Sequence, residues 1–496
     1  MSPAPAPAGA SCLGQLSLDR TVIPVRAKLA IGLERTALIL GLLFTFYHMI
    51  MVFGVFQESL EHYTNHLTGA LIIAGIGALA VSLRSVREGW IFRFLVPSLL
   101  LVLLVLGAIA TGYIRLGLER LETLATFLAP IDMVIGGMLL AAIIGFTWAT
   151  WGVVVTVVVS IAILYFFFGQ HLWGPLAHFG FDPTYVMSYL GMGLTAGLFK
   201  WVPLSADTIF LFMVFGALVN RIHVHMLFME LGKAIGNAVR GGVAYPAVVG
   251  SALIGTVTGN SIGNVVLTGS MTIPLMKRFG YSPANAAAIE AVASSGGQIM
   301  PPIMGLGIFI MAAFLNVPYI DAALRGTIPA ILYFVGVGIA VFFLTRSRGI
   351  QHSLLNVDWR LAARLAPTFV ISFAVLMGLL LRRYSENYAA FFAIATMLGL
   401  AIFQGPQRPS LREVLRGLAE GGITGAQLAV LVIAAGALAQ TVEITNFSEI
   451  AYALLSHTVL GTNTLVALLV AMFFVIVLGT GMPTAIAYVQ IGRAHV

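Results

Sequence analysis

The chain has 496 residues, of which 59% are apolar and only 9% are charged. Soluble globular proteins carry roughly 25% charged residues, so this chain has too few polar side chains to cover a water-facing surface. The composition therefore excludes a soluble enzyme, a disordered chain and a nucleic-acid-binding module, despite the net charge of +7. A single cysteine, Cys12, excludes a disulfide framework or a cysteine-based metal site.

Long segments of the chain contain no Asp, Glu, Lys or Arg. They are 326–345, 387–407, 421–442 and 450–490. A membrane-spanning helix needs about 20 apolar residues to cross about 30 Å of hydrocarbon. These segments lack the polar–apolar alternation of a membrane β-barrel, so the predicted fold class is an all-α, polytopic integral membrane protein.

The first part of the chain is predicted to be a tail followed by five membrane spans. Residues 1–30 are read as a disordered cytoplasmic tail, because the Pro- and Ala-rich start lacks the pattern of a signal peptide. Spans are expected at about 36–56, 66–83, 94–113, 127–147 and 151–170. Basic residues before the first span and after the second place the N-terminus in the cytoplasm by the positive-inside rule.

From residue 184 onward the sequence is richer in glycine, and its apolar segments are interrupted. Residues 184–200 and 206–220 are predicted to be spans. Residues 226–240 and 411–420 are predicted to be amphipathic helices at the membrane interface. Each amphipathic segment precedes a charge-free, glycine-rich stretch, which indicates an internal repeat.

Residues 241–276 carry no charged side chain but are too long for one membrane helix. Their middle, from Thr258 to Asn264, is polar and glycine-rich and is expected to interrupt the helix. Basic residues flank both ends, so both ends are expected to face the cytoplasm. We therefore predict a re-entrant hairpin over 241–278 with its polar tip at membrane depth.

Two further breaks are predicted in apolar sequence. The first, Ser294–Pro302, lies within a broken helix over 282–315, where two successive prolines are expected to leave the carbonyls of Gly297 and Gln298 without helical donors. The second is Gly479–Thr484. One such break is more often a kink than a site, but broken segments at corresponding places in two halves indicate the ion and substrate site of a secondary transporter.

Glu290 lies inside an apolar stretch, where it is either a functional carboxylate or a residue that faces the cytoplasmic vestibule. The sequence shows no His/Asp/Glu or Ser/His cluster of a membrane enzyme and no phosphate-binding loop for ATP. We therefore expect no enzymatic activity and a transport process driven by an ion gradient or by another subunit.

The stretches Gly255–Tyr281 and Ser282–Pro302, with the phrases TIPLMKR and GGQIMPPIMG, resemble the large membrane subunit of tripartite ATP-independent periplasmic (TRAP) transporters. The closest likeness is to the fused form, in which a small four-helix subunit precedes the large one. The resemblance implies three membrane segments and an elevator-type architecture with inverted repeats. They are a small-subunit-like domain with a connector helix over 31–170, a first repeat over 184–345 and a second repeat over 360–490.

The resemblance implies sodium-coupled import of a small organic acid, such as a dicarboxylate, across the bacterial inner membrane, with delivery by a periplasmic TAXI-type substrate-binding protein. The implied sodium ligands are Ser261, Asn264, Gly297, Ile299, Gly479, Thr480 and Gly481. The implied substrate-binding residues are Thr258, Gly259, Asn260, Ser295, Gln298 and Thr484. The alternatives are an ion-coupled elevator-type carboxylate transporter or exchanger that needs no binding protein, a membrane-embedded enzyme and a non-catalytic scaffold.

The family pattern continues past the second hairpin tip to another Pro-Pro break, whereas this chain ends at Val496. Its last six residues, Ile491–Val496, resemble a translated sequencing-adapter sequence. We therefore expect the chain to be truncated within its second repeat, with residues 491–496 not native.

Overall fold

The structure is a computed structural model that describes residues 25–54, 59–84, 91–123, 128–239, 242–350, 354–447 and a few positions beyond. Within these residues, all regular structure is helical and no strand occurs. Nine helices in the described part are long and apolar enough to span a membrane. These findings confirm the predicted all-α, multi-pass membrane fold.

The N-terminal region is a group of packed helices. They are α1 (Val25–Met51), α2 (Ser59–Arg84), α3 (Val96–Leu116), the short α4 (Leu118–Thr123), α5 (Pro130–Trp151) and α6 (Val153–Phe168). The five predicted spans are therefore confirmed. The first one begins at Val25, inside the segment predicted as a tail, because Ala, Leu, Lys, Arg and Glu in residues 25–35 all favour a helix. Residues 1–24 lie outside the described residues.

A buried carboxylate fixes the start of α5 against α3 and α4. The Asp132 side chain has no exposed surface. It accepts hydrogen bonds from the Arg120 guanidinium at 2.5 and 3.0 Å, from the Tyr113 hydroxyl at 2.8 Å and from the backbone N–H of Ala129 at 2.8 Å. The last bond caps the first turn of the helix.

Replacing Asp132 with alanine is expected to lower the free energy of unfolding by about 2–3 kcal/mol, because it leaves the donors of three groups without their acceptor. Thermal or denaturant unfolding in detergent measures the change. Glu34→Ala is the matched control, since its ion pair with Arg84 is exposed on both sides and is worth only about 0–1 kcal/mol. Equal losses in the two variants would contradict the special role of the buried pair.

Residues 183–221 form only one of the two spans that the sequence predicts, the one expected over 206–220. They form α7 (Pro183–Met187), π-helical turns at Ser188–Met192 and Leu204–Ile209, a 3-10 turn at Phe199–Trp201 and α8 (Phe210–Arg221). The predicted span over 184–200 is wrong, because Gly197 adopts a φ of +51° and turns the chain back. The N–H of Leu198 then donates to the carbonyl of Leu190 at 3.1 Å. One span, Phe199–Arg221, remains in this segment.

A buried polar network joins α1 and α2 to the π-helical turn that precedes α8. Nδ1 of His66 lies 2.9 Å from Nε2 of His48, and Nε2 of His66 lies 3.0 Å from Oγ of Ser205. Beside them the Tyr63 hydroxyl donates to Asp207 at 2.8 Å. These bonds connect the N-terminal helices with the following part of the chain.

The hairpin region follows α8. Its helices are α9 (Val224–Ala238), α10 (Tyr245–Thr258), α11 (Ser261–Arg278), α12 (Pro283–Gly296), α13 (Leu306–Leu315) and α14 (Tyr319–Ser347). The amphipathic helix predicted over 226–240 is confirmed as α9, whose buried face includes Leu227 and Phe228. Helices α10 and α11 pack against each other and against α12, so they form the two arms of a hairpin that rests on a third helix.

The remaining helices are α15 (Trp359–Leu381), α16 (Glu386–Ala401) and α17 (Leu411–Ile444). The prediction of a separate amphipathic helix over 411–420 is wrong, because this segment is the first part of the long helix α17. Ser410 and Glu413 cap its start, and the sequence holds no proline before Ile444 that would end the helix.

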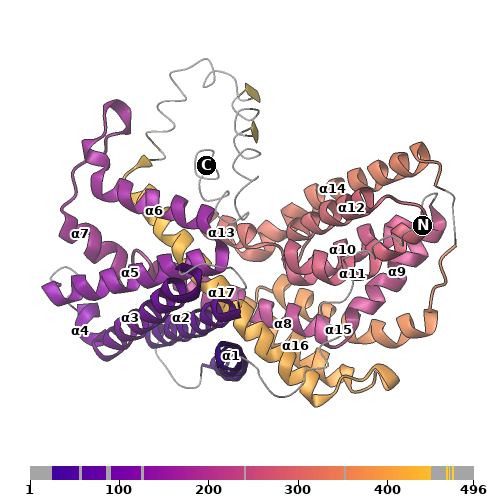
Figure 1. Cartoon of the computed structure of the whole chain (residues 1–496), viewed down its shortest axis with the longest axis horizontal. Coiled ribbons are helices and arrows are strands. Elements are labelled where there is room, and N and C mark those ends of the chain that lie inside the picture. The colour runs from indigo at the N-terminus through magenta and orange to yellow at the C-terminus, as the bar shows by residue number, and fades with distance from the viewer. Residues whose placement is uncertain are drawn as a thin grey trace, which may run out of the picture.

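Helix α17 is the central element of the described structure. It packs against α1, α2, α5 and α6 on one side and against α8 on another. Figure 1 shows it running from the N-terminal helices toward α8 and α16, with α1 to α6 on one side, α9 to α12 and α14 on the other, and α13 between them. The hairpin group contacts the helices around α17 through α8, against which α9 and α10 pack.

Candidate functional site

The hairpin tip is a two-residue break between α10 and α11. Helix α10 ends at Thr258, Gly259 has a φ of +55°, and α11 begins at Ser261. The side-chain oxygen of Asn260 accepts from the N–H of Gly263 at 3.3 Å and so caps α11. The predicted interruption is confirmed, but it is shorter than expected, since residues 261–264 are already helical.

The second predicted break is also present. Helix α12 ends at Gly296, a 3-10 turn covers Gly297–Ile299, and α13 begins at Leu306. The carbonyls of Gly297 and Gln298 have no i+4 helical donor, as predicted, because Pro301 and Pro302 carry no N–H, but these carbonyls are not free. The loop folds back, so that the N–H of Met300 donates to Gly297 at 3.4 Å and the N–H of Gly305 donates to Gln298 at 2.6 Å.

The two breaks lie against each other. The N–H of Ile303 donates to the carbonyl of Thr256 at 3.1 Å, and the amide of Gln298 donates to the Ser261 hydroxyl at 2.6 Å. A Cβ atom on Gly259 would lie 3.1 Å from the carbonyl oxygen of Ile303, so the left-handed glycine also permits the backbones to touch.

This contact brings two helix N-termini together. Helix α11 begins at Ser261 directly after the tip, and α13 begins at Leu306 directly after the second break. A Cβ on Gly305 would lie 3.4 Å from the carbonyl oxygen of Gly259. Free backbone N–H groups at helix N-termini carry a partial positive charge that attracts carboxylates.

Asn264 is a buried polar residue one helical turn after the tip. Its residue surface is 0% exposed, and its Nδ2 donates to the carbonyl of Ser251 at 2.9 Å. Its Oδ1 is buried and has no hydrogen-bond partner among the described residues. The amide lies beside Gly297, because a Cβ there would be 2.9 Å from Nδ2. A buried amide oxygen without a donor is suited to a cation that prefers oxygen ligands.

The structure brings together only some of the residues predicted for the site. Gly259, Ser261, Asn264, Gly297 and Gln298 meet where the hairpin tip contacts the second break. Ile299 lies in the same 3-10 turn as Gly297 and is part-buried.

Other predicted residues lie apart from this contact. Thr258 donates to Ile254 of its own helix at 3.1 Å, and the Ser295 hydroxyl donates to Ala291 at 2.8 Å on the exposed side of α12. Asn260 is exposed at the tip. The third predicted break lies outside the described residues, with Gly479, Thr480, Gly481 and Thr484.

Sequence reasoning missed a group of hydroxyl residues around Glu290. Glu290 is 0% exposed, so the alternative that it faces a cytoplasmic vestibule is wrong. Four hydroxyls surround its carboxyl group, from Ser251 on α10, Thr268 and Thr272 on α11, and Ser294 on α12. The i, i+4 spacing of Thr268 with Thr272 and of Glu290 with Ser294 is visible in the sequence, but the pairing of the three helices is not.

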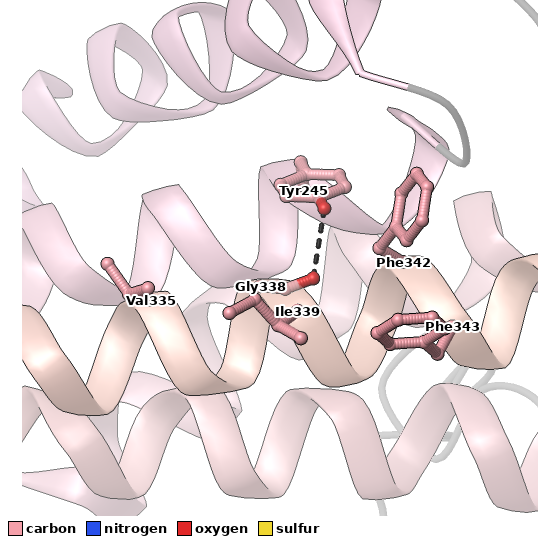
Figure 2. Close-up of a pocket in the computed structure, with 6 residues that line it drawn as sticks. All are labelled: Tyr245, Val335, Gly338, Ile339, Phe342 and Phe343. Atoms are coloured by element: carbon pink, nitrogen blue, oxygen red, sulfur yellow. Dashed lines mark hydrogen bonds between the residues drawn. The ribbon is translucent and has the colours of Figure 1, made fainter.

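A surface depression on α14 is a poor candidate for the site. Figure 2 shows its lining, with the Tyr245 hydroxyl directed toward the Gly338 carbonyl, to which it donates at 3.0 Å. The lining residues are Tyr245, Val335, Gly338, Ile339, Phe342 and Phe343. None of them carries a charge that would bind an organic anion.

A hairpin whose tip meets a broken helix, inside a multi-pass helical protein, is the arrangement of secondary transporters with discontinuous helices. Residues 199–494 match the family described as "Tripartite ATP-independent periplasmic transporter, DctM component". The chain belongs to this family, and with its apolar helices it is a multi-pass inner-membrane protein.

Curated relatives are distant and longer than the matched part. The uncharacterized protein YgiK of Salmonella typhimurium is 22% identical over 47% of this chain and 54% of its own length. The C4-dicarboxylate TRAP transporter large permease protein DctM of Pseudomonas aeruginosa is 25% identical over 34% of this chain and 39% of its own. The protein of that name in Vibrio cholerae is 28% identical over 31% and 32%. The chain spans about half the length of the first of these relatives, and less of the other two.

Proposed function

We propose that this chain is the membrane permease of a secondary transporter that imports a small organic acid together with sodium. In this proposal a periplasmic substrate-binding protein of the TAXI type delivers the organic acid. The observation that carries the proposal is the unpartnered Oδ1 of Asn264, buried beside two helix breaks that meet. Membership of the DctM family supports it independently.

Sodium is a substrate of this process, and the described residues fit it in part. Asn264 would supply its buried amide oxygen, and the Ser261 hydroxyl and the carbonyl of Ile299 lie on the elements that meet there. The carbonyl of Gln298 is a poor ligand, because it already accepts from Gly305. Sodium bound at this place would hold α11 and the 3-10 turn together.

The same contact would receive the carboxylate of the organic acid. The N-termini of α11 and α13 meet at this contact, and the side-chain amide of Gln298 lies beside them. The names of the Pseudomonas and Vibrio relatives refer to C4-dicarboxylates, which supports an organic acid as the substrate class here.

We assign the N-terminal helices to a fused small membrane subunit with a cytoplasmic N-terminus. The family match begins at residue 199, and α1 to α6 precede it. These helices enlarge the scaffold through α17, against which α1, α2, α5 and α6 all pack. The hairpin unit of α10 to α13 would move against this scaffold.

Uptake by proteoliposomes tests the proposal. The full-length protein is reconstituted with a labelled dicarboxylate, with and without its cognate binding protein, and under an inward or no sodium gradient. We expect uptake only when the binding protein and the sodium gradient are both present.

Two outcomes would contradict parts of the proposal. Equal uptake without the binding protein would favour the exchanger-type alternative. Uptake that is indifferent to sodium would refute the coupling ion. Liposomes that contain Asn264→Ala protein serve as the control for uptake that does not pass through the site.

A further inference from the structure

Glu290 is enclosed between three packed helices of the hairpin unit. It projects from α12, and both arms of the hairpin cover it, so that its residue surface is 0% exposed. The four surrounding hydroxyl residues are themselves at most 1% exposed. Water therefore does not solvate this carboxyl group in the described state.

Both oxygens of the Glu290 carboxyl group accept hydrogen bonds from hydroxyl groups. Oε1 accepts from Ser294 at 3.0 Å, from Ser251 at 3.4 Å and from Thr268, while Oε2 accepts from Thr272. Ser251 also lies 3.2 Å from Ser294 and 3.3 Å from Thr268. The hydroxyls thus form one connected network around the carboxyl group.

No cation balances this carboxyl group among the described residues, where Glu290 takes part in no ion pair. The helices and the 3-10 turn packed against α12 carry few titratable groups. They are Tyr245 on α10, Lys277 and Arg278 on α11, and Tyr319, Asp321, Arg325, Tyr333 and Arg346 on α14. Tyr333 and Tyr245 donate elsewhere, to Val292 and Gly338, and Lys277 and Arg278 are exposed at the far end of α11.

A buried carboxylate without a counter-charge is costly, and such groups ordinarily take up a proton. The network here suits either protonation state. Thr268 lies 2.8 Å from the carbonyl of Asn264, and Thr272 lies 3.0 Å from the carbonyl of Thr268. Each threonine has one hydroxyl hydrogen, which it can direct to the ionised carboxylate or to the carbonyl one turn back.

When Glu290 is protonated, its own O–H can donate to a threonine oxygen while that threonine turns its hydrogen to the backbone. Both states are then fully hydrogen-bonded without a change of backbone. Binding forms one O–H bond on a carboxyl oxygen and removes one negative charge, and release reverses both. An arrangement of this kind is suited to repeated loading and unloading of a proton.

We propose that Glu290, with Ser251, Thr268, Thr272 and Ser294, is a proton-binding site of the hairpin unit, and that its proton moves with the organic acid during transport. The proposal rests on the proposed function for its second part. The link to the transport site is direct, since Asn264 donates to the carbonyl of Ser251 and accepts at its own carbonyl from Thr268. Protonation of Glu290 therefore changes the hydrogen-bond partner of the Thr268 hydroxyl, which can also donate to the carbonyl of Asn264.

Infrared difference spectroscopy tests the first part on the full-length protein in liposomes. The carbonyl band of a protonated carboxyl group is followed as a function of pH, in wild type and in Glu290→Gln, with ¹³C-labelled glutamate to assign it. We expect a titrating band in the wild type that Glu290→Gln lacks. Glu443→Gln is the control, because Glu443 pairs with Lys200 at a part-exposed site, and it should keep the band.

Thr272→Val provides a second variant that retains the carboxyl group. It removes a donor that favours the ionised form, so the midpoint of the titration should move to higher pH by about one unit. An unmoved midpoint, or a carboxylate band that responds to sodium and not to pH, would overturn the proton site.

Proton movement is measured with a pH-sensitive dye inside the same liposomes during uptake of the labelled dicarboxylate. We expect Glu290→Gln to abolish the proton movement and the dependence of uptake on pH. Proton movement equal to that of the wild type would overturn the coupled role. The infrared titration does not depend on uptake. If the wild type imported no organic acid, that result would therefore refute the proposed function but not the proton site.

Discussion

Replacing Asn264 with alanine is expected to reduce sodium-dependent uptake about tenfold or more. The variant loses one contact to a charged ion, and a hydrogen bond to a charged group contributes about 1.5–3 kcal/mol. The reason is specific to one atom. Oδ1 of Asn264 is buried and has no partner among the described residues, so it has an acceptor position to offer to a cation. The measurement is initial uptake as a function of sodium concentration.

The amide of Asn264 also has a structural bond, because Nδ2 donates to Ser251 at 2.9 Å. Two further measurements separate that role from ion binding. A bound ion stabilises the folded protein by mass action, so sodium should raise the unfolding temperature of the wild type and not of Asn264→Ala. Asn264→Asp retains an oxygen ligand but loses the amide donor, and it should keep the sodium effect.

Ser270→Ala is the matched control on the same helix, since Ser270 is exposed and its hydroxyl donates to Leu267 of its own turn at 3.0 Å. It should leave uptake and the sodium effect as in the wild type. Unchanged uptake with unchanged sodium dependence in Asn264→Ala would refute the assignment of Asn264.

The hairpin was readable from the sequence because its cause is local. A charge-free stretch that is too long for one span, with Gly259 and Asn260 at its middle, must break there, and the structure breaks there. The length of the break could not be predicted from the sequence. Asn260 caps α11 after only two residues, and whether a polar residue caps a helix or lies in a loop depends on backbone angles that composition does not fix.

The hydrogen bonds of the second break depended on tertiary structure. Two prolines remove two donors at known positions, and this supported the expectation of free carbonyls at Gly297 and Gln298. The carbonyl of Gln298 instead accepts from Gly305, seven residues further along the chain, and the carbonyl of Gly297 accepts from Met300 within the 3-10 turn. A local rule identifies which donors are missing but not which distant donors replace them.

For α17 the error was the opposite one, because the sequence predicted an interruption that the structure does not have. The polar residues at 411–420 suggested a helix of its own, yet small residues such as Gly421 and Gly425 continue it through the bundle. These glycines are tolerated because neighbouring helices approach them closely, with Val214 and Phe210 in contact range. The sequence shows that the residues are small but not which helices fill the space.

That close packing leads to the second large effect, at the crossing of α1 and α17. A Cβ on Gly422 would collide with the carbonyl oxygen of Gly41 and would lie 2.7 Å from Oγ1 of Thr45, whose hydroxyl donates to Leu418 at 2.9 Å. Such backbone approach between small residues is a common means of packing membrane helices.

Gly422→Leu is expected to separate α1 from α17 and to lower the free energy of unfolding by about 3 kcal/mol or more, because the obstructing atoms belong to a backbone that cannot move aside as a side chain can. Thermal unfolding in detergent measures the loss. Gly336→Leu is the matched control, since Gly336 lies on the exposed face of α14 with nothing within 4 Å of its Cβ position, and it should change stability little. If both variants were equally stable, the N-terminal helices would not depend on this crossing for their attachment to α17, and the scaffold role assigned to them would lose its structural basis.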